Sequence, residues 1–102
     1  DPLRAVPIVR GIVAAKAANQ RTVLLRALRD HGAGMEEPAR AALEEAEARL
    51  GMIARRTLVM EDVEGLRGLE GEAASRYFAV FDHLVRPRGP EFRFAGRSRR
   101  PP

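Results

Sequence analysis

The segment from Leu69 to Val85, with the sequence LEGEAASRYFAVFDHLV, decides the fold because its apolar residues recur at helical spacing. At about 100° per residue, one face of such a helix is apolar or aromatic throughout, apart from Glu70. The other members of that face are Ala73, Ala74, Tyr77, Phe78, Val80, Phe81, Leu84 and Val85. We therefore predict a helix over 69–85 that packs this face into a core, with the Glu70 carboxylate on the core side.

Two longer segments upstream have the same periodicity. The pattern predicts a first helix over 4–30, which Gly32 and Gly34 end, and a second helix over 36–56. Because all the strongly periodic segments are helical, the predicted fold class is all-α.

Three glycines, Gly65, Gly68 and Gly71, stand at the junction between the second and third predicted helices. Glycine lowers helix stability, so we expect this stretch to break the helix and change its direction. The preceding residues, 58–66, are predicted as a short helical turn. The glycine pattern matches neither a P-loop nor a dinucleotide-binding motif.

The composition of the 102-residue chain excludes several classes of protein. The length allows one domain at most. The absence of cysteine excludes thiolate metal sites, disulfides and cysteine nucleophiles. Uncharged stretches such as 11–15 are far shorter than the roughly 20 residues of a membrane-spanning helix. We expect a protein that does not enter the membrane, and a cytoplasmic location fits the absence of cysteine.

The segment 86–102 differs from the rest because it holds six arginines, four prolines and a single acidic residue. Arg97, Arg99 and Arg100 crowd its end, a composition suited to binding phosphate oxygens without reading base sequence. These three arginines are therefore candidate DNA contacts. A disordered basic tail without that role is the alternative on composition alone.

Lys16, the one lysine of the chain, falls with Gln20 in the middle of the apolar stripe of the first helix, and Asn19 lies at its edge. A buried ammonium must find a carboxylate or an anion, and a carboxylate on an apolar face must find a cation. Glu70 therefore either pairs with a cation such as Lys16 or binds a metal ion. Lys16 is in turn either part of a structural cluster or a DNA contact.

Three segments of the chain resemble the CRISPR-associated endonuclease and integrase of the adaptation module, which inserts new spacers. The run at 12–21, IVAAKAANQR, is similar to the opening helix of that family's α-helical domain. The run at 66–74, LRGLEGEAA, followed by Tyr77 and Phe78, resembles its central Gly-x-Glu-Gly motif. The run at 94–102, FAGRSRRPP, resembles its basic linker.

This resemblance implies a metal-dependent DNA endonuclease and integrase in which a DNA 3′-hydroxyl attacks a phosphodiester of the CRISPR repeat. The family binds Mg²⁺ or Mn²⁺ through a Glu, a His and an Asp, of which only the Glu carries over, onto Glu70. The family's His and Asp lie downstream of the basic linker, so His31 and His83 do not replace them. By this resemblance residues 1–85 would form part of a larger α-helical catalytic domain, with 86–102 as the basic linker to the rest of it. The isolated 102-residue chain is accordingly expected to be an inactive fragment.

The resemblance also implies partners and supporting residues. The full-length protein would be a homodimer that acts on prespacer DNA and the CRISPR repeat with a small ferredoxin-like partner, in a bacterial or archaeal cytoplasm. Lys16 is a further candidate DNA contact. The residues expected to support the fold or the site are Gly68, Gly71, Tyr77, Asn19 and Gln20.

Two other functions remain open on the residues alone. A non-catalytic helical module would bind nucleic acid through its arginines, with a steep salt dependence and no need of Glu70. A helical hairpin for protein interaction would instead pack its alanine-rich stripes on a partner.

Overall fold

The computed structural model of the chain describes residues 2–85, and within them every regular element is helical. The elements are α1 (Pro2–His31), the 3₁₀ turn η1 (Gly32–Gly34), α2 (Glu37–Thr57), α3 (Val63–Ala79) and α4 (Phe81–Val85). The predicted all-α class is thus confirmed.

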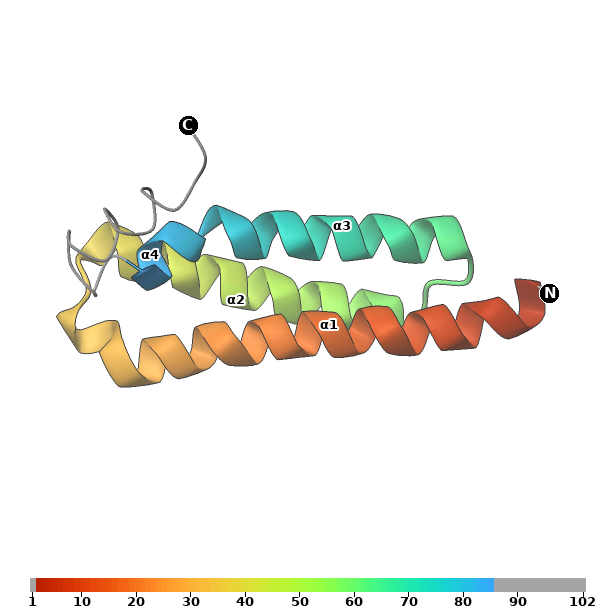
Figure 1. Ribbon diagram of the computed structural model, residues 1–102, viewed down its shortest axis with the longest axis horizontal. Coiled ribbons are helices and arrows are strands. Elements are labelled where there is room, and N and C mark those ends of the chain that lie inside the picture. Colours follow the sequence, from red (N-terminus) through yellow and green to blue (C-terminus); the bar gives the residue numbers. More distant parts are fainter. Residues whose placement is uncertain (1, 86–102) are drawn as a thin grey trace, which may run out of the picture.

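The three long helices lie side by side and all contact one another. Figure 1 shows that α2 runs back along α1 and that α3 runs back along α2. As a result α1 and α3, which are far apart in the sequence, are neighbours that point in the same direction. The short α4 lies at the end of the bundle where α1 meets α2.

The core is aliphatic and draws on each long helix. Its fully buried large side chains come from one stripe of each helix, as an amphipathic helix requires. They are Val13, Leu24, Leu43, Leu50, Ile53 and Leu66. Small residues such as Ala17, Ala46 and Ala73 are buried between them, which lets the helix backbones approach closely.

Arginines of α1 tie this helix to α2 at two points. The Arg10 guanidinium donates from Nε to the Thr57 carbonyl at 3.0 Å and from Nη2 to the Met60 carbonyl at 2.6 Å, beyond the last turn of α2. Arg21 Nε lies 2.7 Å from Oε1 of Glu47. The buried Gly51 makes room for Arg21, because a Cβ there would lie 3.2 Å from its Nε.

The first two helices were predicted to within two residues at each end. α1 begins at Pro2 rather than near residue 4, and Pro7 therefore lies inside the helix, where it removes one backbone donor. The glycines at 32 and 34 end α1 as expected, through the turn η1. Among residues 2–85, no helix is both long and apolar enough to cross a lipid bilayer.

The predicted break at the glycines is wrong, as is the separate turn over 58–66. α3 begins at Val63 and continues through Gly65, Gly68 and Gly71. Asp62 caps this helix by accepting a hydrogen bond from the Gly65 amide at 3.3 Å. Burial of Leu66 and Leu69, which lie between the glycines, outweighs the low helix propensity of glycine, because propensity is a weak preference compared with packing.

Gly65 has a further reason to be glycine. A Cβ at this position would collide with the sulfur of Met60 and would lie 2.7 Å from Oδ1 of the capping Asp62. Gly68 and Gly71 are different, because an added Cβ would meet nothing within 4 Å in either case.

The prediction of one continuous helix over 69–85 is also wrong at its C-terminal end. α3 stops at Ala79, and the buried Val80 separates it from α4. The Val80 amide bonds to the Tyr77 carbonyl at 3.2 Å, which tightens the last turn, and the His83 amide bonds to the Val80 carbonyl at 3.0 Å. This irregularity turns Phe81, predicted to be on the core face, to 44% exposure.

The apolar stripe predicted for α1 is only partly covered. The buried residues centre on Val13, Ala17 and Leu24, whereas Ile12 and Val23 are 47% and 44% exposed. By helical periodicity the two exposed residues lie on the same flank as Lys16. Phe78, near the end of α3, and Phe81, at the start of α4, form a similar exposed apolar flank, with Phe78 64% exposed.

Candidate functional site

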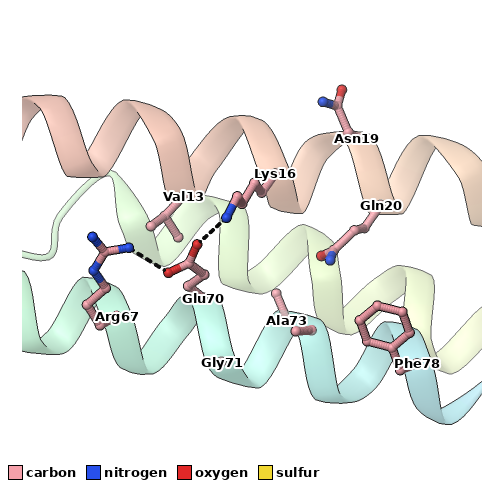
Figure 2. A pocket seen from close by; sticks show the side chains of 10 residues that line it. Val13, Lys16, Asn19, Gln20, Arg67, Glu70, Gly71, Ala73 and Phe78 are labelled. Carbon is pink, nitrogen blue, oxygen red and sulfur yellow. Dashed lines mark hydrogen bonds and ion pairs between the residues drawn. The ribbon is translucent and has the colours of Figure 1, made fainter.

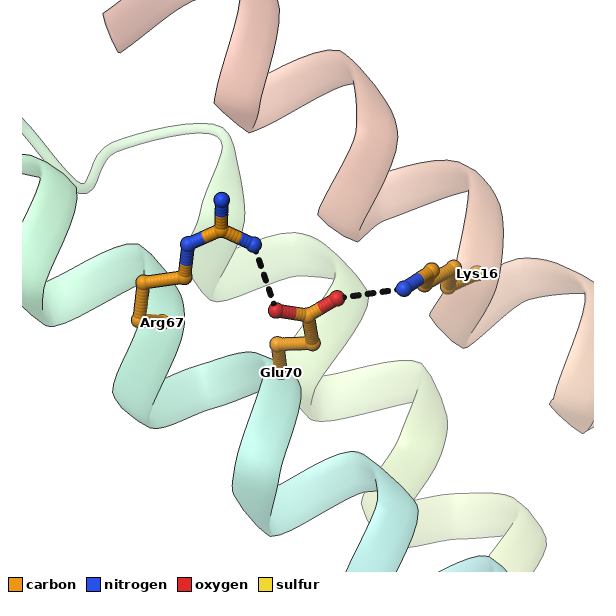
Figure 3. A network of polar contacts seen from close by, with 3 residues as sticks. All are labelled: Lys16, Arg67 and Glu70. Atoms are coloured by element: carbon orange, nitrogen blue, oxygen red, sulfur yellow. Dashed lines mark hydrogen bonds and ion pairs between the residues drawn. The ribbon is translucent and has the colours of Figure 1, made fainter.

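Glu70 lies on α3 with each carboxylate oxygen held by a different cation (Figure 3). Lys16 Nζ, from α1, is 2.6 Å from Oε2, and Arg67 Nη1, one turn earlier on α3, is 2.9 Å from Oε1. The Glu70 side chain is 21% exposed, so it sits at the edge of the core rather than within it. The ion pair with Lys16 is one of the two arrangements that the sequence predicted for this carboxylate.

The prediction that Lys16 is buried is wrong, since its side chain is 60% exposed. The buried stripe of α1 centres on Val13 and Ala17, which places Lys16 toward its edge. The ammonium therefore reaches the carboxylate from the solvent side. Arg67 was not identified from the sequence as a partner of Glu70, although its i,i+3 position on the same helix was a usable signal.

The two cations change the acidity of Glu70. Hydrogen bonds from Lys16 and then Arg67 lower the pKa of the carboxyl below its ordinary value of 4.5, and partial burial opposes them. The bonds to the charged form are the stronger influence, so the carboxylate stays ionised at neutral pH. A charged oxygen ligand is thus present at this position without any metal ion.

A pocket of about 600 Å³ opens beside Glu70 between α1 and α3 (Figure 2). Its lining combines polar and apolar side chains. The lining residues are Val13, Lys16, Asn19, Gln20, Arg67, Glu70, Gly71, Ala73, Ala74 and Phe78. The pocket therefore combines an ionised carboxylate, two cations and an apolar wall. Val13 and Phe78 were not identified as site residues from the sequence.

The side chains of Gln20 and Asn19 point in different directions from α1. Figure 2 shows the Gln20 side chain extending from α1 toward the side where Ala73 and Phe78 lie, whereas Asn19 points away from α3. Oε1 of Gln20 is buried and has no hydrogen-bond partner among the described residues. Buried acceptors are normally satisfied, so this oxygen is open to a donor.

The other predicted site residues are spread around this centre. Gly71 lines the pocket, whereas Gly68 is exposed and does not. Tyr77 packs against the core and contacts the rings of Phe78 and Phe81 at centroid distances of 5.4 and 6.4 Å. The candidate DNA contacts Arg97, Arg99 and Arg100 lie outside the described residues.

A divalent cation would find a single acidic ligand here. Within residues 2–85, no three His, Asp or Glu side chains are grouped so that they could hold a metal ion. Glu70 itself fits the chemistry, because it presents an ionised oxygen that already attracts positive charge. His31 ends α1 and His83 belongs to α4, and neither lines the pocket.

Comparison with known proteins identifies the family of the chain. The family model described as CRISPR associated protein Cas1 matches residues 1–102, the entire chain. The chain belongs to the Cas1 family. The resemblance seen in its three sequence segments is thereby confirmed, and the carboxylate at 70 lies in the Gly-x-Glu-Gly motif on which that resemblance partly depended.

Relatives within the Cas1 family share a large part of the sequence. The chain is 50% identical over 96 residues to CRISPR-associated endonuclease Cas1 2 of Rhodospirillum rubrum, covering 93% of this chain and 28% of the relative. It is 45% identical over 95 residues to CRISPR-associated endonuclease Cas1 1 of Chlorobaculum tepidum, covering 93% and 27%.

A third relative is a fusion protein. The chain is 38% identical over 105 residues to a CRISPR-associated exonuclease Cas4/endonuclease Cas1 fusion of Rhodospirillum rubrum, covering 100% of this chain and 17% of the relative. The chain thus spans less than a third of the length of these curated relatives. No solved structure matches it significantly. All three relatives carry the word endonuclease in their names.

Proposed function

We propose that the chain forms part of the catalytic domain of a metal-dependent DNA endonuclease and integrase that inserts spacers into CRISPR arrays. Glu70 would be a ligand of Mg²⁺ or Mn²⁺, and a DNA 3′-hydroxyl would attack a phosphodiester of the repeat. The observation that carries this proposal is the ionised Glu70 carboxylate at the edge of an open pocket.

The chemistry of the pocket supports this assignment. Mg²⁺ and Mn²⁺ prefer oxygen ligands, and the lowered pKa of Glu70 means that no proton has to leave before a cation binds. A divalent cation held there would polarise the phosphate and stabilise the leaving oxygen. Arg67 would keep the carboxylate oriented through its bond to Oε1. The apolar wall formed by Ala73, Ala74 and Phe78 would restrict water on one side of the site.

The DNA substrate would be bound largely through its phosphates. Lys16 lies at the pocket with an exposed side chain, and Arg97, Arg99 and Arg100 would add positive charge through the linker at 86–102. Such contacts position DNA without reading its sequence. Asn19, on the outward side of α1, is placed for the same role (Figure 2).

The remaining parts of the site would come from a protein of the relatives' length that contains this chain, called the full-length protein below. By family resemblance a His and an Asp complete the metal site, the protein forms a homodimer, and a small ferredoxin-like partner assists it. We expect the isolated chain to be inactive, because residues 2–85 offer a single suitable ligand. The exposed apolar flanks, with Ile12, Val23, Phe78 and Phe81, suit a face that packs against the rest of a larger helical domain.

A strand-transfer assay with Glu70→Gln tests the proposal. In the full-length protein this substitution should reduce Mn²⁺-dependent joining of prespacer DNA to a CRISPR repeat by at least about a hundredfold. Glu47→Gln is a matched control, because Glu47 is also a partly buried carboxylate in an interhelical ion pair, with 17% exposure, but lies outside the pocket. Strand transfer that survives Glu70→Gln would contradict the assignment.

The same variants address the non-catalytic alternative. A simple nucleic-acid-binding module would bind DNA equally well with and without Mn²⁺, and Glu70→Gln would leave that binding unchanged. The proposed enzyme should instead lose metal-dependent activity while retaining the salt-dependent part of its DNA binding.

A further inference from the structure

We propose that Lys16 is an exchangeable counterion of Glu70, which leaves the carboxylate when a divalent cation binds and moves to Oε1 of Gln20. This inference rests on the proposed function, since it takes Glu70 to be the metal ligand. The proposal assigns a positioning role to Lys16 and Gln20, both on α1. Apart from the bond between Lys16 and Glu70, neither makes a described hydrogen bond with α3.

Both oxygens of the Glu70 carboxylate are already occupied. Lys16 Nζ is 2.6 Å from Oε2 and Arg67 Nη1 is 2.9 Å from Oε1. A metal–oxygen bond of roughly 2.1 Å leaves no room for an ammonium in contact with the same oxygen lone pair, and the two positive charges repel each other. Each oxygen keeps a second lone-pair site, so the charge repulsion, rather than a lack of sites, favours the withdrawal of one of the two side chains when Glu70 binds a divalent cation.

Lys16 is the side chain that can withdraw at lower cost. Arg67 belongs to the same helix as Glu70 at i,i+3, so helix geometry keeps the two together. Lys16 reaches across from α1 on a flexible stem, and its 60% exposure means that water already surrounds much of it. An ammonium is also strongly hydrated, which favours its release into the open pocket.

Gln20 provides a place for the released ammonium. It follows Lys16 at i+4, so both side chains project from the same face of α1, and both line the pocket. Its Oε1 is a buried acceptor without a partner among residues 2–85, while Lys16 has donors only. Figure 2 shows the Gln20 amide on the pocket side of α1, beyond the Lys16 stem. The exchange would satisfy this acceptor as it frees the carboxylate.

The test is the affinity of the full-length protein for Mn²⁺ alone, measured by the decrease of the free-ion electron paramagnetic resonance signal. Lys16→Met should tighten Mn²⁺ binding about two- to fivefold, the range that corresponds to an exposed ion pair. Gln20→Met should weaken it by a similar factor, but should have no effect in a protein that already carries Lys16→Met. These opposite signs distinguish exchange from general loosening of the helices.

Further variants serve as controls for the Mn²⁺ affinity measurement. Arg21→Met breaks the comparable pair between α1 and α2, with Glu47, and should leave Mn²⁺ affinity unchanged. Lys16→Gln keeps a long side chain without the charge and should reproduce Lys16→Met. If Lys16→Met weakens binding or leaves it unchanged, or if Arg67→Met tightens binding more than Lys16→Met does, the exchange is wrong.

Glu70→Gln separates the two proposals. If it leaves Mn²⁺ affinity unchanged, the metal is held elsewhere and the proposed function fails together with the exchange. If Glu70→Gln abolishes binding while Lys16→Met does not tighten it, Glu70 remains the ligand and only the exchange is overturned.

Discussion

Nζ of Lys16 and Oε2 of Glu70 lie 2.6 Å apart, although 54 residues separate them in the chain. The contact joins α1 to α3 directly at the mouth of the pocket. Lys16 is mostly exposed and Glu70 mostly covered, so one partner is well hydrated and the other is not. This asymmetry lets the pair hold two helices together while remaining open to competition from solvent cations.

We predict that Lys16→Met lowers the free energy of unfolding by about 0.2 to 1 kcal/mol in the presence of a chelator, because an exposed partner and salt screening limit the value of the pair. A double-mutant cycle with Glu70→Gln, measured by urea denaturation, gives the coupling energy. The coupling should shrink as ionic strength rises. A coupling that is zero at low salt would show that the pair does not stabilise the helix packing.

Stability should depend on pH through Glu70. Its pKa is lowered in the folded chain, so between the lowered value and the ordinary 4.5 the unfolded state binds the proton more readily. The stabilisation is therefore present above pH 4.5 and is lost as the pH falls through the folded-state pKa. Urea denaturation of the wild type and Glu70→Gln should show curves that differ at pH 6 and converge in acid. Parallel curves across that range would argue against the shift.

The glycines of α3 should respond to alanine in opposite ways. Gly68→Ala and Gly71→Ala place a Cβ in open space and should each stabilise the chain by up to about 1 kcal/mol, the propensity gain within a helix. Gly65→Ala should destabilise it, because the Cβ would displace the Asp62 carboxylate that caps α3 as well as the side chain of Met60. Thermal unfolding followed by circular dichroism checks all three. Destabilisation by Gly68→Ala would mean that this glycine has a contact that residues 2–85 do not explain.

The basic linker should govern the salt dependence of DNA binding. Replacing Arg97, Arg99 and Arg100 together with alanine should reduce the slope of log affinity against log salt by about 2 to 3, near 0.9 for each phosphate that the protein no longer neutralises. Fluorescence anisotropy with duplex DNA at several salt concentrations measures the slope. Arg29→Ala and Arg40→Ala serve as controls, because both arginines pair with acidic neighbours on their own helices. An unchanged slope in the triple variant would remove the linker from the DNA interface.

The sequence predicted the helices where periodicity was continuous and failed where local propensity and packing disagreed. α1 and α2 carry long apolar stripes with clear ends, so both were placed correctly. At Gly65 to Gly71 the low propensity of glycine suggested a break, but Leu66 and Leu69 bury enough surface to keep the helix intact. The end of α3 at Ala79 had no comparable signal, because neither glycine nor proline marks it.

The candidate site could be predicted only in part, because helical periodicity does not show how far one helix covers another. An isolated carboxylate on an apolar face pointed to Glu70, and the one lysine on a facing helix pointed to its partner. The exposure of Lys16 and the unpaired acceptor of Gln20 depend on how far α2 and α3 cover α1, and periodicity does not give that extent. Phe81 was expected in the core because the helix was taken to continue undisturbed to residue 85, whereas Phe78 lies within α3 on an apolar face that the neighbouring helices cover only in part.

Because α1 and α3 run in the same direction, successive turns of one helix lie opposite successive turns of the other. Gln20 lies about one turn beyond Lys16 on α1, and Ala73 lies about one turn beyond Glu70 on α3, in the same direction (Figure 2). One residue inserted into either helix would rotate all later residues of that helix by about 100° and turn their side chains away from the pocket. Changes of length would therefore disturb the pocket least in the connections at the ends of the helices.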